Sequence, residues 1–237
     1  GAASFLCPRS WFPPPVDADA AVEIETWLTD MKSTQKLTYT LCDAEGHTVA
    51  QTTVPAAKTK VMMTIPHVHR WHGRTDPYLY QATILLTEGD QVLDQVHTCF
   101  GCRTFRIDPE KGFYLNDEPY PLHGVSRHQD WEGIGNALLP EHHDRDMELI
   151  CEMGANTIRL AHYQHDSYFY DLCDRHGMIV WAEIPYISTH MENGFENTLS
   201  QMKELIIQNY NHPSIVVWGL SNEITIGGDS LPGLMEN

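Results

Sequence analysis

The sequence predicts an all-β immunoglobulin-like sandwich followed by an α/β domain built on a parallel sheet. Two observations support this fold class. Residues 20–105 contain a series of β-rich runs separated by turn signals, whereas from Tyr120 onward apolar strands alternate with amphipathic helices. We place the boundary between the two patterns near residue 105, so that residues 1–105 form the sandwich and residues 106–237 the α/β domain.

The first domain is predicted from period-two alternation and from turns. Residues 21–28 alternate apolar with polar side chains, and the β-rich run 37–43 stops at the turn signal of residues 44–47. Further strands are expected at residues 61–65, 78–86 and 92–100. Short strands with turns at this spacing are typical of an immunoglobulin-like sandwich, and no stretch with helical periodicity competes with them.

The second domain is predicted from the alternation of helices and strands. Strands are expected at residues 122–125, 156–161, 178–182 and 214–220, and helices at residues 140–153, 166–176 and 198–210. Gly154 and Gly177 mark the ends of the first two helices. The resulting β-α-β-α-β-α-β order indicates a parallel sheet with right-handed crossovers.

Composition excludes several classes of protein. A net charge of −17 disfavours partners such as nucleic acid and anionic membranes, whose binding needs a basic patch. No apolar run reaches the roughly 18 residues of a membrane span, and residues 1–6 lack the features of a signal peptide. We therefore expect a cytoplasmic protein, and a chain that starts at Gly1 is expected to come from inside a longer one.

The cysteines do not predict a disulfide framework or a metal site. Six are scattered through the 237 residues, and Cys99 and Cys102 form a lone CxxC pair without a second pair or a histidine at ligand spacing. We expect unbridged, structural thiols.

Polar side chains follow each of the four predicted parallel strands. His128 follows the first, Arg159 and His162 the second, Glu183 the third, and the pair Asn222–Glu223 the fourth. Because functional residues of parallel α/β folds lie at the carboxyl ends of the strands, these side chains are expected to share one edge of the sheet. Four such strand ends in a row are hard to explain by packing alone.

Four ordered segments resemble motifs of glycoside hydrolase family 2, the β-galactosidase/β-glucuronidase family. Residues 211–223, NHPSIVVWGLSNE, resemble its acid/base signature, and residues 124–128, GVSRH, its GVNRHE segment. Residues 154–163, GANTIRLAHY, resemble its GxNxxRxSHY segment, and the fourth match, LCDRHG followed by WAE, covers residues 172–183 in the expected order. Ser126 and Gln129 depart from the usual Asn and Glu.

The resemblance implies roles for the residues at the strand ends. Glu223 would be the general acid/base of a retaining glycosidase, and Asn222 would bind the sugar 2-hydroxyl. Arg159 would hold the second, nucleophilic carboxylate ionised, while His128 and His162 would contact sugar hydroxyls. Two structural alternatives stay open: Glu223 could pair with Arg159 as a salt bridge, and Glu183 could be a member of a buried polar network.

The resemblance also implies an incomplete barrel. Residues 106–237 would be the first half of a (β/α)8 TIM barrel, which needs about 250 residues, and the nucleophilic Glu would lie beyond residue 237. The fragment alone is therefore expected to be inactive, and its open edge to favour homo-oligomers or pairing with another chain. Magnesium is a cofactor of some relatives, but Ser188 replaces the usual carboxylate ligand beside His190, so no metal site is assigned.

We expect a carbohydrate substrate with a terminal β-linked sugar, and a β-galactoside before a β-glucuronide or a β-mannoside. The alternative from another class is a non-catalytic carbohydrate-binding protein on the same fold. Three tryptophans are candidates for stacking on sugar rings, namely Trp11, Trp71 and Trp131, although Trp71 is expected to pack inside the sandwich or at the domain joint.

Overall fold

The computed structural model describes residues 3–8 and 18–225. The chain forms two compact units. The first runs up to Tyr120 and includes Asn211–Pro213, and the second comprises Pro121–Tyr210 and the chain from Ser214 onward. The first is all β and the second is α/β, so the predicted fold class is confirmed.

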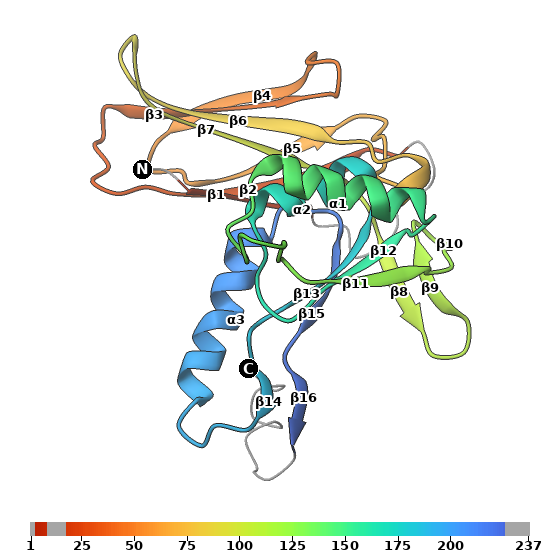
Figure 1. Ribbon diagram of the computed structural model, residues 1–237. Helices are drawn as coiled ribbons and strands as arrows, with labels where there is room; N and C mark the ends of the chain where they lie inside the picture. The colour runs from red at the N-terminus through yellow and green to blue at the C-terminus, as the bar shows by residue number, and fades with distance from the viewer. Residues whose placement is uncertain (1–2, 9–17, 226–237) are drawn as a thin grey trace. The chain divides into compact units, whose positions relative to one another are not determined.

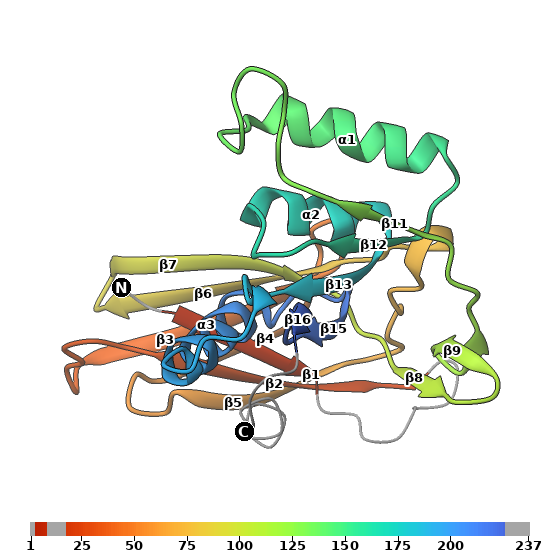
Figure 2. The same ribbon diagram turned by 60° about the horizontal axis from the view of Figure 1, so that its bottom comes forward.

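The first unit is a sandwich of two antiparallel sheets, which Figure 2 shows as stacked layers. One sheet has the strand order β1-β2-β5 and the other β4-β3-β6-β7. The strands are β1 (Ala3–Pro8), β2 (Ala20–Trp27), β3 (Gln35–Cys42), β4 (Thr48–Pro55), β5 (Lys60–Ile65), β6 (Tyr80–Glu88) and β7 (Gln91–Phe100).

The core of the sandwich follows from the alternation in its strands. In β3, Leu37, Tyr39 and Leu41 are fully buried, while the residues between them are partly or fully exposed. In β2, Val22 and Ile24 are buried in the same way. Because successive side chains point to opposite faces of a strand, this pattern turns one face of each sheet into the shared core.

Strand β4 was not predicted, and its position in the sheet gives the reason. It lies at the edge of its sheet, pairs only with β3, and none of its side chains is fully buried. An edge strand lacks the clear apolar alternation by which strands are recognised.

A small antiparallel sheet completes the first unit. It has the order β10-β9-β8, from β8 (Phe105–Asp108), β9 (Gly112–Leu115) and β10 (Glu118–Pro119), and a 3-10 turn, η1 (Gly73–Thr75), precedes β6. Trp71 has no exposed surface, and the Asn116 side chain donates to its carbonyl oxygen at 3.0 Å. Trp71 is therefore a packing residue, as expected.

The second unit is built on a parallel sheet of four strands in the order β11-β12-β13-β15 (Figure 1). The strands are β11 (Gly124–Arg127), β12 (Thr157–Leu160), β13 (Ile179–Glu183) and β15 (Ile215–Gly219). Helices α1 (Pro140–Glu152), α2 (Ser167–His176) and α3 (Phe195–Asn209) connect them in turn. A two-stranded parallel sheet, β14 (Ile187–Thr189) with β16 (Asn222–Thr225), follows the ends of β13 and β15.

The helix ends follow from local chemistry. Pro140 opens α1, where its missing N–H has no partner to lose. The Asp166 carboxylate caps α2 by accepting from the Tyr168 N–H at 2.8 Å, and Gly177 closes it with φ 69°, a left-handed conformation that glycine adopts without strain. The third helix begins at Phe195 rather than at residue 198.

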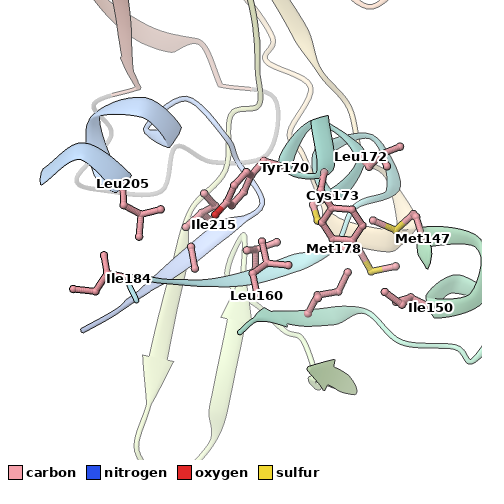
Figure 3. Packing of buried hydrophobic residues seen from close by; sticks show 14 of the residues in the cluster. Met147, Ile150, Leu160, Tyr170, Leu172, Cys173, Met178, Ile184, Leu205 and Ile215 are labelled. Carbon is pink, nitrogen blue, oxygen red and sulfur yellow. The ribbon is translucent and has the colours of Figure 1, made fainter. Parts of the chain in front are cut away.

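An apolar core lies between the sheet and its helices (Figure 3). Ile158 and Leu160 of β12 are fully buried within it, with Leu205 of α3 and Ile215 of β15. None of the helices in residues 3–8 and 18–225 has the length and hydrophobicity of a membrane span. The prediction of unbridged thiols is confirmed for Cys42, Cys99, Cys102, Cys151 and Cys173; the side chain of Cys7 and all of Trp11 lie outside what the structure describes.

Candidate active site

The face of the parallel sheet that turns away from the apolar core carries polar side chains. Ser126, Arg159 and Trp181 are register partners in β11, β12 and β13, so they form one row across the sheet. The side chain of Trp181 is 43% exposed, and the Arg159 guanidinium lies 6.0 Å from the centre of its ring. Alternation therefore puts Ile158 and Leu160 into the core and Arg159 on the opposite face.

Arg159 is the centre of a cluster of four side chains, which we call the rim cluster: Arg159, His162, Glu183 and Asn222. Its Nε donates to Glu183 Oε1 at 2.5 Å, and its Nη2 donates to Asn222 Oδ1 at 2.6 Å. His162 Nδ1 lies 3.2 Å from the same Nη2. Residues in or just after β12, β13 and β15 are thus brought together, as the sequence predicted.

Glu183 is the buried anchor of the rim cluster. Its side chain is 1% exposed, and its second oxygen, Oε2, lies 2.9 Å from His162 Nδ1. Because an ionised carboxylate only accepts hydrogen bonds, Nδ1 is the donor in this contact, and Nε2 is the ring nitrogen that the contact leaves unused. Glu183 is thus a member of a buried polar network, which is the structural alternative that sequence analysis left open for this residue.

Asn222 is positioned by β14 and β16. Its backbone N–H donates to the Tyr186 carbonyl oxygen at 2.9 Å, and it pairs with Ile187 in the parallel ladder. Since an arginine only donates, the bond from Arg159 identifies the Asn222 atom facing it as the amide oxygen. The amide NH2 of Asn222 therefore points its two donors elsewhere.

Gly219 is the last residue of β15 and lies three residues before Asn222. Its surroundings leave no room for a side chain. A Cβ atom there would come within 2.7 Å of Glu183 Cγ and would also collide with the Trp181 indole. Close packing against Gly219 therefore holds Glu183 and Trp181 in the positions that the rim cluster needs.

Glu223 lies next to Asn222 but is not bonded into the rim cluster. Its backbone takes a left-handed φ of 52°, the residue is exposed, and its carboxylate makes no hydrogen bond or ion pair with any described residue. Arg159 pairs with Glu183 instead of Glu223. The salt bridge between Arg159 and Glu223 that sequence analysis weighed as an alternative does not form.

His128 joins the rim cluster through its ring. Its imidazole is exposed and contacts the His162 ring edge-on, with 5.1 Å between ring centres. The structure thus links four of the five predicted site residues in a chain of contacts, from His128 through His162 and Arg159 to Asn222, and the fifth, Glu223, follows Asn222 in the sequence.

The donors considered for magnesium do not converge. His190 Nδ1 lies 2.6 Å from the Tyr186 hydroxyl, and Ser188 supplies no charge. In residues 3–8 and 18–225, no group of three or more acidic, histidine or cysteine side chains close enough to share an ion contains His190 or Glu223. These residues do not fit a magnesium ion, which prefers carboxylate and water oxygens.

A second polar cluster, centred on Arg127, lies on the helix side of the sheet and was not predicted. The Arg127 side chain is 5% exposed and donates from Nε and Nη2 to Asp146 at 2.8 and 2.7 Å. Its other donors reach His165 Nδ1 and His143 Nδ1, each at 3.1 Å, and its guanidinium lies 3.8 Å from the centre of the Phe169 ring. Arg127 is the last residue of β11 and Arg159 lies within β12. Arg127 is in register with the buried Leu160, whereas Arg159 is in register with Ser126, so alternation puts the two arginines on opposite faces of the sheet.

His165 links the Arg127 cluster to the rim cluster. Its Nε2 donates to the carbonyl oxygen of Ala161 at 3.1 Å, and Ala161 immediately precedes His162. Burial, helped by the neighbouring Arg127 cation, lowers the pKa of His165 to about 3. Burial also lowers the pKa of His143. Both rings are therefore neutral acceptors for Arg127 at neutral pH.

We expect the stability of the protein to fall as the pH drops from about 6.5, the value of an unfolded histidine, toward 3. Within that window the unfolded chain protonates His165 and the folded chain does not, so protons favour unfolding. The contribution of His165 is on the order of 5 kcal/mol at most, because one pKa unit equals about 1.36 kcal/mol. Chemical denaturation at pH 7 and pH 4.5 measures it.

The control is His165→Asn, whose amide oxygen can take the place of Nδ1 as the acceptor for Arg127 and which does not titrate. Its loss of stability between pH 7 and pH 4.5 should be smaller than that of the wild type by about 2 kcal/mol or more. Equal pH dependence in the two proteins would contradict a neutral, buried His165.

Comparison with known proteins gives matches over nearly the whole chain. Residues 11–103 match the family described as "Glycosyl hydrolases family 2", and residues 106–232 match its "TIM barrel domain". A β-glucuronidase of Bacteroides fragilis is 41% identical over 222 residues, 90% of this chain. A β-galactosidase of Thermoanaerobacter pseudethanolicus is 33% identical over 152 residues, 63% of this chain. 

A similar solved structure is that of an FMN-binding β-glucuronidase from Facaelibacterium prausnitzii L2-6. It is 42% identical, has a TM-score of 0.89 and covers 96% of this chain. The chain spans 35% of the length of that protein, 31% of the B. fragilis relative and 20% of the T. pseudethanolicus relative.

Proposed function

The chain belongs to family 2 of the glycosyl hydrolases, and we propose that it is part of a retaining β-glycosidase in which Glu223 is the general acid/base. The observation that carries this proposal is the rim cluster, with Glu223 next to Asn222 at the carboxyl end of the fourth parallel strand. Carboxylate, amide, imidazole and guanidinium groups at one edge of a parallel α/β sheet suit the recognition and cleavage of a polar substrate.

The roles follow from which atoms remain available. Arg159 occupies the amide oxygen of Asn222, so the amide NH2 can donate to a sugar hydroxyl, which in a retaining enzyme is the 2-hydroxyl. Glu183 occupies Nδ1 of His162, so Nε2 is the ring nitrogen left to bind a second hydroxyl. His128 packs against the His162 ring and presents a further imidazole to the same sugar.

The chemistry needs two carboxyl groups about 5–5.5 Å apart. Glu223 would protonate the leaving oxygen and then activate the water that releases the sugar. Glu183 does not suit the role of nucleophile, because both of its oxygens are bonded and it is 1% exposed. We propose that the attacking carboxylate comes from a part of the protein outside this chain, and that cleavage requires no bound metal.

The proposed substrate is a β-glucuronide. The motifs alone favoured a β-galactoside, but the relatives that match at 41% and 42% identity are β-glucuronidases, and the β-galactosidase matches at 33% over a shorter stretch. A β-galactoside is the second candidate, and a β-mannoside the third.

A panel of p-nitrophenyl glycosides with the full-length protein tests this function. We expect kcat/KM on the β-glucuronide to exceed that on the β-galactoside and β-mannoside by more than about a hundredfold, because a site built for a polar group rejects analogues that lack it. The activity should persist in EDTA. Faster hydrolysis of the galactoside would reverse the order of candidates, and loss of activity in EDTA would contradict hydrolysis without a metal.

The panel also separates the enzyme from a non-catalytic carbohydrate-binding protein. Such a protein would bind the glycosides, as seen by calorimetry, without releasing p-nitrophenol. That result would reject the proposed enzyme while leaving the rim cluster as a binding site.

A further inference from the structure

The loop between β11 and α1, residues 128–139, which we call the rim loop, carries a tryptophan that the proposed mechanism does not use. Of the tryptophans considered for sugar stacking, Trp71 is fully buried, whereas Trp131 is 37% exposed. Ile134 and Leu139 in the same loop are 41% and 54% exposed. The rim loop thus exposes three large apolar side chains, whereas the rim cluster is polar.

The tip of the rim loop is closed by its own backbone. Trp131 N–H donates to the Gly135 carbonyl oxygen at 2.9 Å, and Gly135 N–H donates back to Trp131 at 3.0 Å. Gly133 and Gly135 have φ of 84° and 61°, left-handed conformations that allow so tight a turn. The Trp131 ring also lies edge-on to His142 of α1, with 4.9 Å between ring centres.

Both ends of the rim loop are tied to the second unit. Gln129 N–H donates to the Tyr163 hydroxyl at 2.9 Å, and the Gln129 amide oxygen accepts from the Asp166 N–H at 2.7 Å. At the other end, Leu139 N–H donates to His142 Nδ1 at 3.0 Å. The loop that carries Trp131 is therefore held in place before a ligand binds, so binding does not have to supply the free energy of ordering it.

Chain geometry places Trp131 within reach of the rim cluster. It lies three residues after His128, so their Cα atoms are at most about 11 Å apart. His128 contacts His162, to which the sugar is assigned above. A glycoside whose sugar lies on the rim cluster can therefore extend its other half toward Trp131.

We propose that Trp131 is the binding platform for an aromatic or otherwise apolar aglycone, the group that leaves when the glycosidic bond breaks. The inference rests on the proposed function, since it takes the rim cluster as the site of the sugar. The polar groups of that cluster suit sugar hydroxyls, whereas an exposed indole, in a loop that also exposes Ile134 and Leu139, suits the flat face of an aromatic ring.

The test measures binding of two non-hydrolysable ligands, phenyl and methyl 1-thio-β-D-glucuronide, to the full-length protein by calorimetry. In the wild type the phenyl ligand should bind more tightly than the methyl ligand. Trp131→Ala should reduce that preference about tenfold, which equals about 1.4 kcal/mol. Trp131→Phe should retain the preference within about threefold, because it keeps an aromatic ring.

Trp27→Ala is the matched control, because Trp27 is 46% exposed on β2 of the other unit and should leave the preference unchanged. An unchanged preference in Trp131→Ala, in a protein that does hydrolyse glycosides, would reject the platform but keep the enzyme. A protein that hydrolyses no glycoside in the panel would reject the proposed function, and the ratio of the two affinities would still decide whether Trp131 binds the aromatic group.

Discussion

Replacing Arg159 with methionine is expected to lower kcat/KM on the best glycoside by about a hundredfold or more, as for the loss of a preorganised donor at a reacting centre. The variant removes the cation that holds both Glu183 and Asn222. The Glu183 carboxylate, 1% exposed, would keep only His162 as a partner, and the Asn222 amide would no longer be fixed.

Stability should fall as well, because breaking a buried pair leaves an uncompensated charge. We expect a loss of about 3 kcal/mol, at the lower end for such pairs, since the Arg159 side chain is 35% exposed. Arg145→Met is the control: it removes an exposed pair with Glu148 in α1 and should change stability by less than about 1 kcal/mol.

Arg159→Lys separates the effect of the charge from that of the geometry. Lysine keeps the positive charge but lacks the planar guanidinium that donates to Glu183 and Asn222 at once. It should recover part of the stability and little of the activity. Activity of Arg159→Met within about threefold of the wild type, measured on folded protein, would contradict the central position of Arg159.

The elements that sequence analysis predicted best are those with local chemical signals. Pro140 and Gly177 mark the start of α1 and the end of α2, and the strand at residues 37–43 shows its alternation plainly. Strand β4 was missed because an edge strand buries no complete face, and α3 starts earlier than expected because no N-cap side chain marks its start.

The sequence predicted which residues belong to the site, but not which of them are hydrogen-bonded to one another. Motifs and strand ends pointed to Arg159, His162 and Asn222, and the structure brings them together around Glu183. That Glu183 and not Glu223 pairs with Arg159 depends on the register of β12 against β13, which no local pattern encodes. The burial of Arg127 on the helix side follows instead from alternation within β11, because Arg127 lies one residue beyond Ser126.

Glu223 is the residue on which the proposed mechanism depends. A general acid matters in proportion to the basicity of the leaving group, because a poor leaving group needs a proton and an activated aryl group does not. The value of kcat/KM reports the steps up to the first irreversible one, in which the bond to the leaving group breaks. Glu192→Gln, which changes another exposed glutamate of the second unit, is the matched control.

The most direct measurement is therefore kcat/KM of full-length Glu223→Gln on the methyl and the 2,4-dinitrophenyl β-glycosides of the preferred sugar. The account predicts a loss of about 10²–10⁴-fold on the methyl glycoside and a loss below about tenfold on the dinitrophenyl glycoside. Equal losses on both substrates, or full activity on the methyl glycoside, would show that Glu223 is not the acid.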